Sequence, residues 1–145
     1  ILGQDGADRL PLLEQARSLG LAGKIDFLVD LTPAEVSSIV ARATACIQPS
    51  LVEPFGLAVI EAGSCGVPVA ASRVGGHVEL IDDGNTGLLF SPGNPASILA
   101  ALRLLLNEPE SAASMAANFR RQVSTRFTWE NCAKMYLTVS NRSFN

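Results

Sequence analysis

Two carboxylates bracket the segment of this chain that is richest in chemistry. Glu53 and Glu61 enclose seven residues, among them Pro54 and Gly56, and the segment runs into an apolar stretch. A proline and a glycine before such a stretch indicate a loop that turns into a helix, whose first amides lack intrahelical partners and attract phosphate. Pro54 would suit the first turn of that helix. Helical spacing of the residues from Leu57 onward predicts that Glu53 lies in the loop and Glu61 on the helix.

The separation of these carboxylates limits what they could hold together. Eight residues of helix rise about 12 Å at most. Acceptors this far apart could bind hydroxyls at the two ends of an extended ligand while helix amides hold an anion between them, which is the layout of a sugar nucleotide. Each carboxylate alone has a plainer interpretation, because a Glu before a helix stabilises the positive end of the helix dipole and a Glu within one is often solvated.

Short apolar runs alternate with amphipathic stretches along the chain, which predicts an α/β fold with a parallel sheet. The expected strands are residues 25–29, 45–48, 69–72 and 87–90, and residues 1–2 resemble the tail of a strand whose beginning is absent. The expected helices are residues 7–19, 33–42, 57–65, 95–107, 110–126 and 129–140. Ligands of open parallel sheets collect at the carboxyl ends of the strands. We therefore expect the loops 49–57 and 73–76 to share one edge.

Capping residues mark two of the expected helices. Thr32 and Glu35 are spaced as a capping box at the start of the helix 33–42. Thr128 is the expected N-cap of the last helix, and Trp129 is an expected packing anchor.

The blocks that follow one another along the chain resemble the family-4 retaining glycosyltransferases, in their nucleotide-sugar-binding C-terminal half. The matching blocks are 49–57, 61–62, 66–72, 75–76, Glu79 and 86–89. The resemblance covers most of the 145 residues. It implies that residues 1–145 form a Rossmann-like donor-binding domain, one half of a GT-B fold, without the first strand and the N-terminal acceptor domain.

The resemblance also implies roles for individual residues. In that family the two glutamates of an E-x7-E motif contact the transferred sugar, at the position of Glu53, and the nucleotide ribose, at the position of Glu61. Amides matching Phe55, Gly56 and Leu57 lie against the sugar and the diphosphate. The implied activity is transfer of a hexose from a nucleoside-diphosphate sugar to an acceptor hydroxyl with retained configuration, with Glu53 orienting the sugar and with neither a metal nor another cofactor.

Three departures from the family pattern qualify this interpretation. The Arg and Lys that neutralise the donor diphosphate belong to a segment N-terminal to this one, and Lys24 lies in a later block. Val29 stands where the family commonly has a glycine near the base. No acceptor domain lies within 145 residues, so we expect the isolated chain to bind donor weakly and to complete no transfer. The alternatives are a non-catalytic nucleotide- or sugar-binding module and another GT-B enzyme, such as a nucleotide-sugar epimerase.

Further polar residues near the motif have two interpretations each. His77 could reach a sugar or phosphate, or make a local hydrogen bond. Arg73 could face the donor, or be solvated or ion-paired. Gly75 and Gly76 provide unusual backbone angles or a close approach, and Glu79 is expected to cap or steady the turn after them.

Composition indicates a globular domain and excludes several classes of protein. The chain is 48% hydrophobic and 17% charged with a net charge of −3, and its scattered basic residues argue against a nucleic-acid partner. It contains neither a transmembrane run nor a signal peptide, so we expect a cytoplasmic location. Cys46, Cys65 and Cys132 lack the spacing of a disulfide framework or a metal site and are expected to be small core residues. No repeat or linker suggests an internal domain boundary.

Overall fold

A computed structural model describes residues 1–3 and 6–142 of the chain, with side chains as far as Val139. The chain forms two compact units, a first unit of Ile1–Ile39 and a second unit of Val40–Asn145. The sequence has no linker at this division, and no boundary was expected there. Within the described residues, no helix is long and apolar enough to cross a membrane.

The first unit contains a small parallel sheet and a flanking helix. Its elements are β1 (Leu2–Gly3), α1 (Arg9–Ser18), β2 (Leu28–Val29) and most of α2 (Pro33–Val40). Strands β1 and β2 pair in parallel, with Leu2 opposite Leu28. The strand expected at 25–29 is confined to its last two residues, because β1 offers only two residues for it to pair with.

The predicted capping box at the start of α2 is confirmed. The Thr32 amide donates to Glu35 Oε2 at 2.8 Å, and the Glu35 amide donates to Thr32 Oγ1 at 3.4 Å. Each of two backbone groups without an intrahelical partner thus gains a side-chain acceptor.

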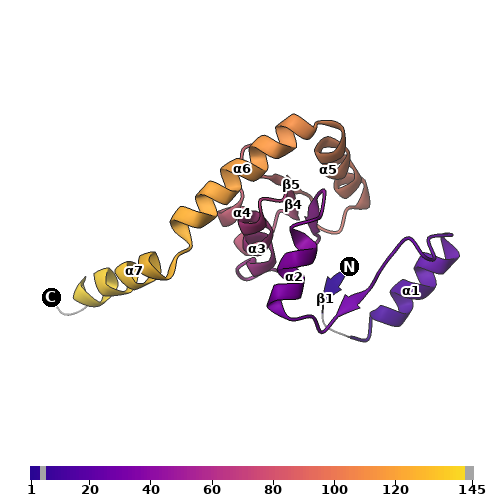
Figure 1. The fold of residues 1–145 in the computed structure, drawn as a ribbon, viewed down its shortest axis with the longest axis horizontal. Coiled ribbons are helices and arrows are strands. Elements are labelled where there is room, and N and C mark those ends of the chain that lie inside the picture. The colour runs from indigo at the N-terminus through magenta and orange to yellow at the C-terminus, as the bar shows by residue number, and fades with distance from the viewer. Residues whose placement is uncertain (4–5, 143–145) are drawn as a thin grey trace. The chain divides into compact units, whose positions relative to one another are not determined.

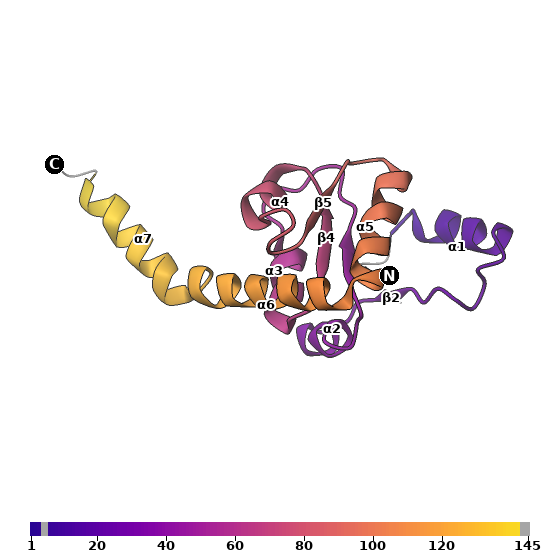
Figure 2. The same cartoon turned by 90° about the horizontal axis from the view of Figure 1, so that it is seen from above.

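The second unit holds the larger sheet, shown with its helices in Figures 1 and 2. Three parallel strands lie in the order β3–β4–β5, and β4 is fully buried between its two neighbours. Helices α3 and α4 lie on one side of β4 and β5 and α5 lies on the other, while α6 packs against both α3 and α5. The elements are β3 (Cys46–Gln48), α3 (Leu57–Cys65), β4 (Val69–Ser72), α4 (Gly75–Leu80), β5 (Leu88–Phe90), α5 (Pro95–Asn107), α6 (Pro109–Arg126) and α7 (Trp129–Arg142).

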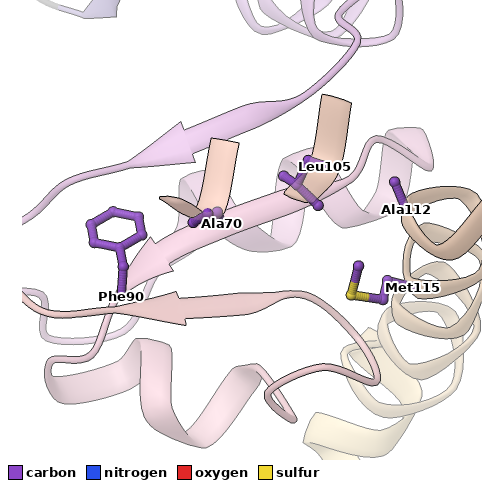
Figure 3. Close-up of a cluster of buried hydrophobic side chains, with 6 residues drawn as sticks. Ala70, Phe90, Leu105, Ala112 and Met115 are labelled. Atoms are coloured by element: carbon purple, nitrogen blue, oxygen red, sulfur yellow. The ribbon is translucent and has the colours of Figure 1, made fainter. Parts of the chain in front are cut away.

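A hydrophobic cluster joins the sheet of the second unit to α5 and α6. Figure 3 shows Ala70 and Phe90 from the sheet, Leu105 from α5, and Ala112 and Met115 from α6. Alanines on β4 and α6 allow the helices to approach the sheet closely, and the burial of larger side chains between them favours the folded state. The α/β class and the parallel strands flanked by helices are confirmed.

Several local expectations need correction. Helix α4 was not predicted, because two glycines open it and only six residues form it. Trp129 is 90% exposed, so the expected packing anchor is not buried against the residues that the structure describes. Thr128 caps α7 as expected, its hydroxyl accepting the Asn131 amide at 3.1 Å. Cys132 is exposed rather than a core residue, while Cys46 and Cys65 are half-buried.

Candidate functional site

The loop between β3 and α3, residues 49–56, is called the motif loop below. It ends at Gly56, whose φ of 98° lies in the left-handed region that a side chain disfavours. Helix α3 begins at Leu57, so Pro54 lies in the loop and its expected place in the first turn is wrong. The predicted stop at Gly66 is confirmed, because this residue ends α3 with a φ of 73°. Glu53 thus lies in the loop and Glu61 on the helix, as expected.

Glu53 organises the motif loop around its own carboxylate. Its Oε1 accepts the Gly56 amide at 2.9 Å and the Phe55 amide at 3.3 Å. Its Oε2 accepts the Ser50 hydroxyl at 3.4 Å, and the side chain is 21% exposed. The expectation of amides free for an anion is therefore not met at Phe55 and Gly56, whose N–H groups point at a carboxylate of the same loop.

The two glycines at the start of α4 lie directly against the motif loop. The Gly76 amide donates to the Glu53 carbonyl at 2.9 Å. A Cβ on Gly75 would lie 2.0 Å from the Glu53 carbonyl oxygen, and one on Gly76 would lie 2.2 Å from the Phe55 carbonyl oxygen. The predicted close approach is confirmed, and so is the prediction that both loops share the edge formed by the carboxyl ends of β3 and β4.

A small network of buried polar groups lies beneath this contact. The Ser72 hydroxyl, at the end of β4, donates to the Ser50 carbonyl at 2.6 Å. His77 is fully buried, and its Nδ1 lies 3.0 Å from the Ser72 carbonyl oxygen. The interpretation of His77 as a local hydrogen-bonding residue is therefore the one the structure supports. Its Nε2 lies 3.9 Å from Glu53 Oε2.

The N-terminal end of α3 carries polar groups without a partner among the described residues. Within the described part of the chain, the amides of Leu57 and Ala58 make no hydrogen bond, as expected for the first turn of a helix. Glu61 is exposed, and its side chain follows that of Leu57 by one turn on the same side of the helix. The beginning of α3 thus offers two amide donors at the positive end of the helix dipole and, one turn further along, an accessible carboxylate.

Arg73 and Glu79 contribute little to the beginning of α3. The Arg73 guanidinium is ion-paired with the Asp83 carboxylate, so its ion-paired interpretation is confirmed. Glu79 lies within α4 rather than beside a turn, and its exposed side chain makes no hydrogen bond to any residue that the structure describes. No group of three or more His, Cys, Asp or Glu side chains among the described residues could hold a metal ion.

The sequence did not indicate that Ser50 and Ser72 join the motif loop to β4, because neither has the context of a catalytic nucleophile. Their positions were the available signal. Ser72 ends β4 and Ser50 follows the end of β3 by two residues, at the sheet edge where neighbouring loops meet. A separate open groove of about 680 Å³ runs along α6, lined by Ala112, Ala116 and Arg120 among others, and none of the predicted site residues borders it.

Comparisons with known proteins agree with this arrangement. A family model described as glycosyl transferases group 1 matches residues 1–122. The glycogen synthase of Mycobacterium tuberculosis is 33% identical over 129 residues, which are 89% of this chain and 31% of that protein. The D-inositol 3-phosphate glycosyltransferase of Corynebacterium urealyticum is 36% identical over 135 residues, 92% of this chain and 32% of that protein. The chain thus spans about a third of the length of these curated relatives.

Solved structures show the same fold. The Anabaena protein HepE, in complex with UDP and glucose, superposes with a TM-score of 0.88 at 26% identity, covering 97% of this chain and 39% of that one. Its likeness extends to both units of the chain, since nearly every residue is covered. By the family match and by these relatives, the chain belongs to the group 1 glycosyl transferases.

Proposed function

We propose that this chain is the donor-binding part of a retaining glycosyltransferase that moves a hexose from a nucleoside-diphosphate sugar to an acceptor hydroxyl. The observation that carries the proposal is the N-terminal end of α3 described above. There, the amides of Leu57 and Ala58 have no partner among the described residues, and the exposed carboxylate of Glu61 follows one turn later on the helix. UDP is the nucleotide to test first, because the structurally similar HepE was solved with UDP and glucose.

The chemistry of the transfer requires negative charge to be stabilised on the departing diphosphate. Fixed amides at a helix start do this without reorganising, and the helix dipole adds to their effect. In our proposal the amides of Leu57 and Ala58 receive a phosphate oxygen, Glu61 accepts the ribose hydroxyls, and Glu53 orients the sugar through the part of its carboxylate that the loop amides do not use. Phe55 and Gly56 lie against the sugar, and no metal takes part.

The remaining groups come from the rest of the protein. Because the chain spans about a third of its curated relatives, we propose that the acceptor site and the cations facing the diphosphate lie outside it. Charge-assisted contacts are roughly twice as strong as neutral ones. The isolated chain therefore binds donor weakly and does not transfer sugar.

The test is a titration with UDP, GDP, ADP and their glucose conjugates, followed through the backbone amide signals of the chain. The comparison is between the wild type, Glu61→Gln and Glu110→Gln, the last being a control that removes an exposed carboxylate from the first turn of α6. We expect one nucleotide to shift the signals of residues 53–58 and the Glu61 variant to bind it roughly tenfold more weakly, as for a lost hydrogen bond to a charged group. Equal weakening by both variants, or shifts confined to other elements, would refute the proposal.

One observation favours a second candidate, a nucleotide-binding module without catalysis. Glu53 already has amide partners on Oε1 and a hydroxyl on Oε2, as a purely structural carboxylate would. Assay of the full-length protein with donor and acceptor separates the two functions, since the module binds but yields no transfer. Turnover of the donor in the absence of any acceptor would instead indicate an epimerase.

A further inference from the structure

The hydrogen bonds around His77 decide which ring nitrogen carries a proton. The Ser72 carbonyl, 3.0 Å from Nδ1, can only accept a hydrogen bond. The Ser72 hydroxyl lies 3.4 Å from Nδ1, but its own hydrogen is directed to the Ser50 carbonyl at 2.6 Å. Nδ1 therefore bears a hydrogen in both the neutral and the charged ring. Nε2 is therefore the ring nitrogen that is free to take up a proton.

The other ring nitrogen has no hydrogen-bond partner among the described residues. His77 Nε2 is fully buried. The charged group that faces it is the Glu53 carboxylate, whose Oε2 lies 3.9 Å away. A Cβ on Gly56 would lie 3.2 Å from His77 Cδ2, so the ring packs directly against the residue that precedes α3. Because Nε2 is enclosed, a ligand does not touch it, and its effect passes through Glu53.

We propose that His77 is a positioning residue for Glu53: its protonated Nε2 holds Oε2 in one orientation for the sugar, and its neutral form leaves Oε2 unfixed. This inference rests on the donor site proposed above. Protonation would give Nε2 a hydrogen to donate to the carboxylate, and it would also reduce the net negative charge beside the amides that receive the diphosphate. A fixed carboxylate and a less negative site both favour donor binding when Nε2 carries a proton.

Other charged groups near the ring do not account for such coupling. From the motif loop, Glu53 is the carboxylate facing His77. From β4 and the turn after it, Ser72 is neutral and Arg73 is ion-paired with Asp83. From α4 itself, Glu79 is exposed. The coupling should therefore disappear when Glu53 alone loses its charge.

The first test needs no ligand. His77 is the only histidine in the chain, so nitrogen NMR of a histidine-labelled sample gives one set of ring signals, followed across about pH 5 to 8. We expect Nδ1 to carry a hydrogen throughout, and Glu53→Gln, but not Glu110→Gln, to lower the pH at which Nε2 titrates. An unchanged titration in Glu53→Gln, or a bare Nδ1, would overturn the proposal whether or not the chain binds a nucleotide.

The second test asks whether the interaction of His77 with Glu53 affects donor binding in the full-length protein. We compare His77→Gln, which places an amide donor near Nε2, with His77→Asn, which keeps a donor near Nδ1 and removes the group facing Glu53. We expect the wild-type affinity for UDP-glucose to rise on acidification, both variants to lose this pH dependence, and His77→Asn to bind roughly three- to tenfold more weakly than His77→Gln.

The two tests fail in different ways. A pH dependence that persists in either His77 variant, or equal affinities of the two variants, refutes the positioning role. Absence of nucleotide binding at every pH refutes the donor site instead, and the ligand-free titration still decides whether His77 and Glu53 are coupled.

Discussion

Replacing Gly76 by alanine tests the contact on which the site depends. The new Cβ would lie 2.2 Å from the Phe55 carbonyl oxygen and 2.6 Å from its Cα. These are backbone atoms, so no side-chain rotation relieves the overlap. The Gly76 amide would also lose its 2.9 Å bond to the Glu53 carbonyl as the loop is pushed away.

The magnitude follows from these two effects and one that opposes them. Overpacking costs about 1–3 kcal/mol, and a lost buried hydrogen bond costs about 1 kcal/mol. Alanine also reduces the conformational entropy of the unfolded chain, which offsets about 0.4–1 kcal/mol of this loss in stability. We therefore expect Gly76→Ala to lower the free energy of unfolding of the second unit by about 1–3.5 kcal/mol.

Gly84→Ala is the matched control, because it separates backbone strain from steric overlap. Gly84 has a φ of 81°, and a Cβ added to it would meet no heavy atom within 4 Å beyond its neighbours in the chain. A left-handed alanine costs about 1–2 kcal/mol, which the same unfolded-state effect partly offsets. We expect a net loss of about 1 kcal/mol and unchanged amide signals in residues 53–57.

The assay is urea unfolding followed through amide signals of the second unit, combined with the amide spectrum of each folded variant. Gly76→Ala should shift the signals of Phe55 and Gly56 as well as lowering stability. If the loop moves enough to relieve the overlap, the stability loss shrinks while the shifts grow. A variant no less stable than Gly84→Ala, with those signals in place, would refute the reasoning.

Three further predictions concern individual side chains. Hydrogen bonds from the hydroxyl and then the amide of Thr32 lower the pKa of Glu35, so its stabilising contribution is present at neutral pH and is lost as the pH falls through this lowered pKa. The difference in urea midpoint between wild type and Glu35→Gln should therefore shrink below about pH 4, and a difference independent of pH would contradict this. Burial raises the pKa of the Cys46 thiol, so iodoacetamide at pH 8 should label exposed Cys132 first in a mass-spectrometric time course, and equal rates would count against the structure. Phe119 is fully buried, so Phe119→Ala should cost about 3–5 kcal/mol in urea unfolding, and a loss below about 1 kcal/mol would show that it lies outside the core.

Much of the fold was predictable because its signals are local. The helical spacing after Leu57 and the left-handed glycine at 66 set the limits of α3 without reference to the rest of the chain. Asn94 likewise starts α5 by accepting the amides of Ala96 and Ser97. The family resemblance is a local signal too, because it rests on short blocks of sequence. The positions of Glu53 in the loop and Glu61 on the helix follow from one such block.

Elements without a local signal could not be predicted. Helix α4 opens with two glycines and runs for six residues, a pattern that by itself indicates a turn. It is held where the amide of Gly76 meets the Glu53 carbonyl, a partner 23 residues earlier in the chain. The exposure of Trp129 was missed for the same reason, because a large aromatic side chain indicates burial only if another element covers it.

The class of fold, the motif that carries the donor-site proposal and the family of the chain can all be read from the order of its residues. How the motif's polar atoms are used depends on the tertiary structure. It turned the Phe55 and Gly56 amides onto Glu53, left those of Leu57 and Ala58 without a partner among the described residues, and buried His77 against Gly56. The reason is that parallel pairing of β3 and β4 brings together loops distant in the chain, and the partners of a buried polar atom depend on that pairing rather than on its neighbours in sequence.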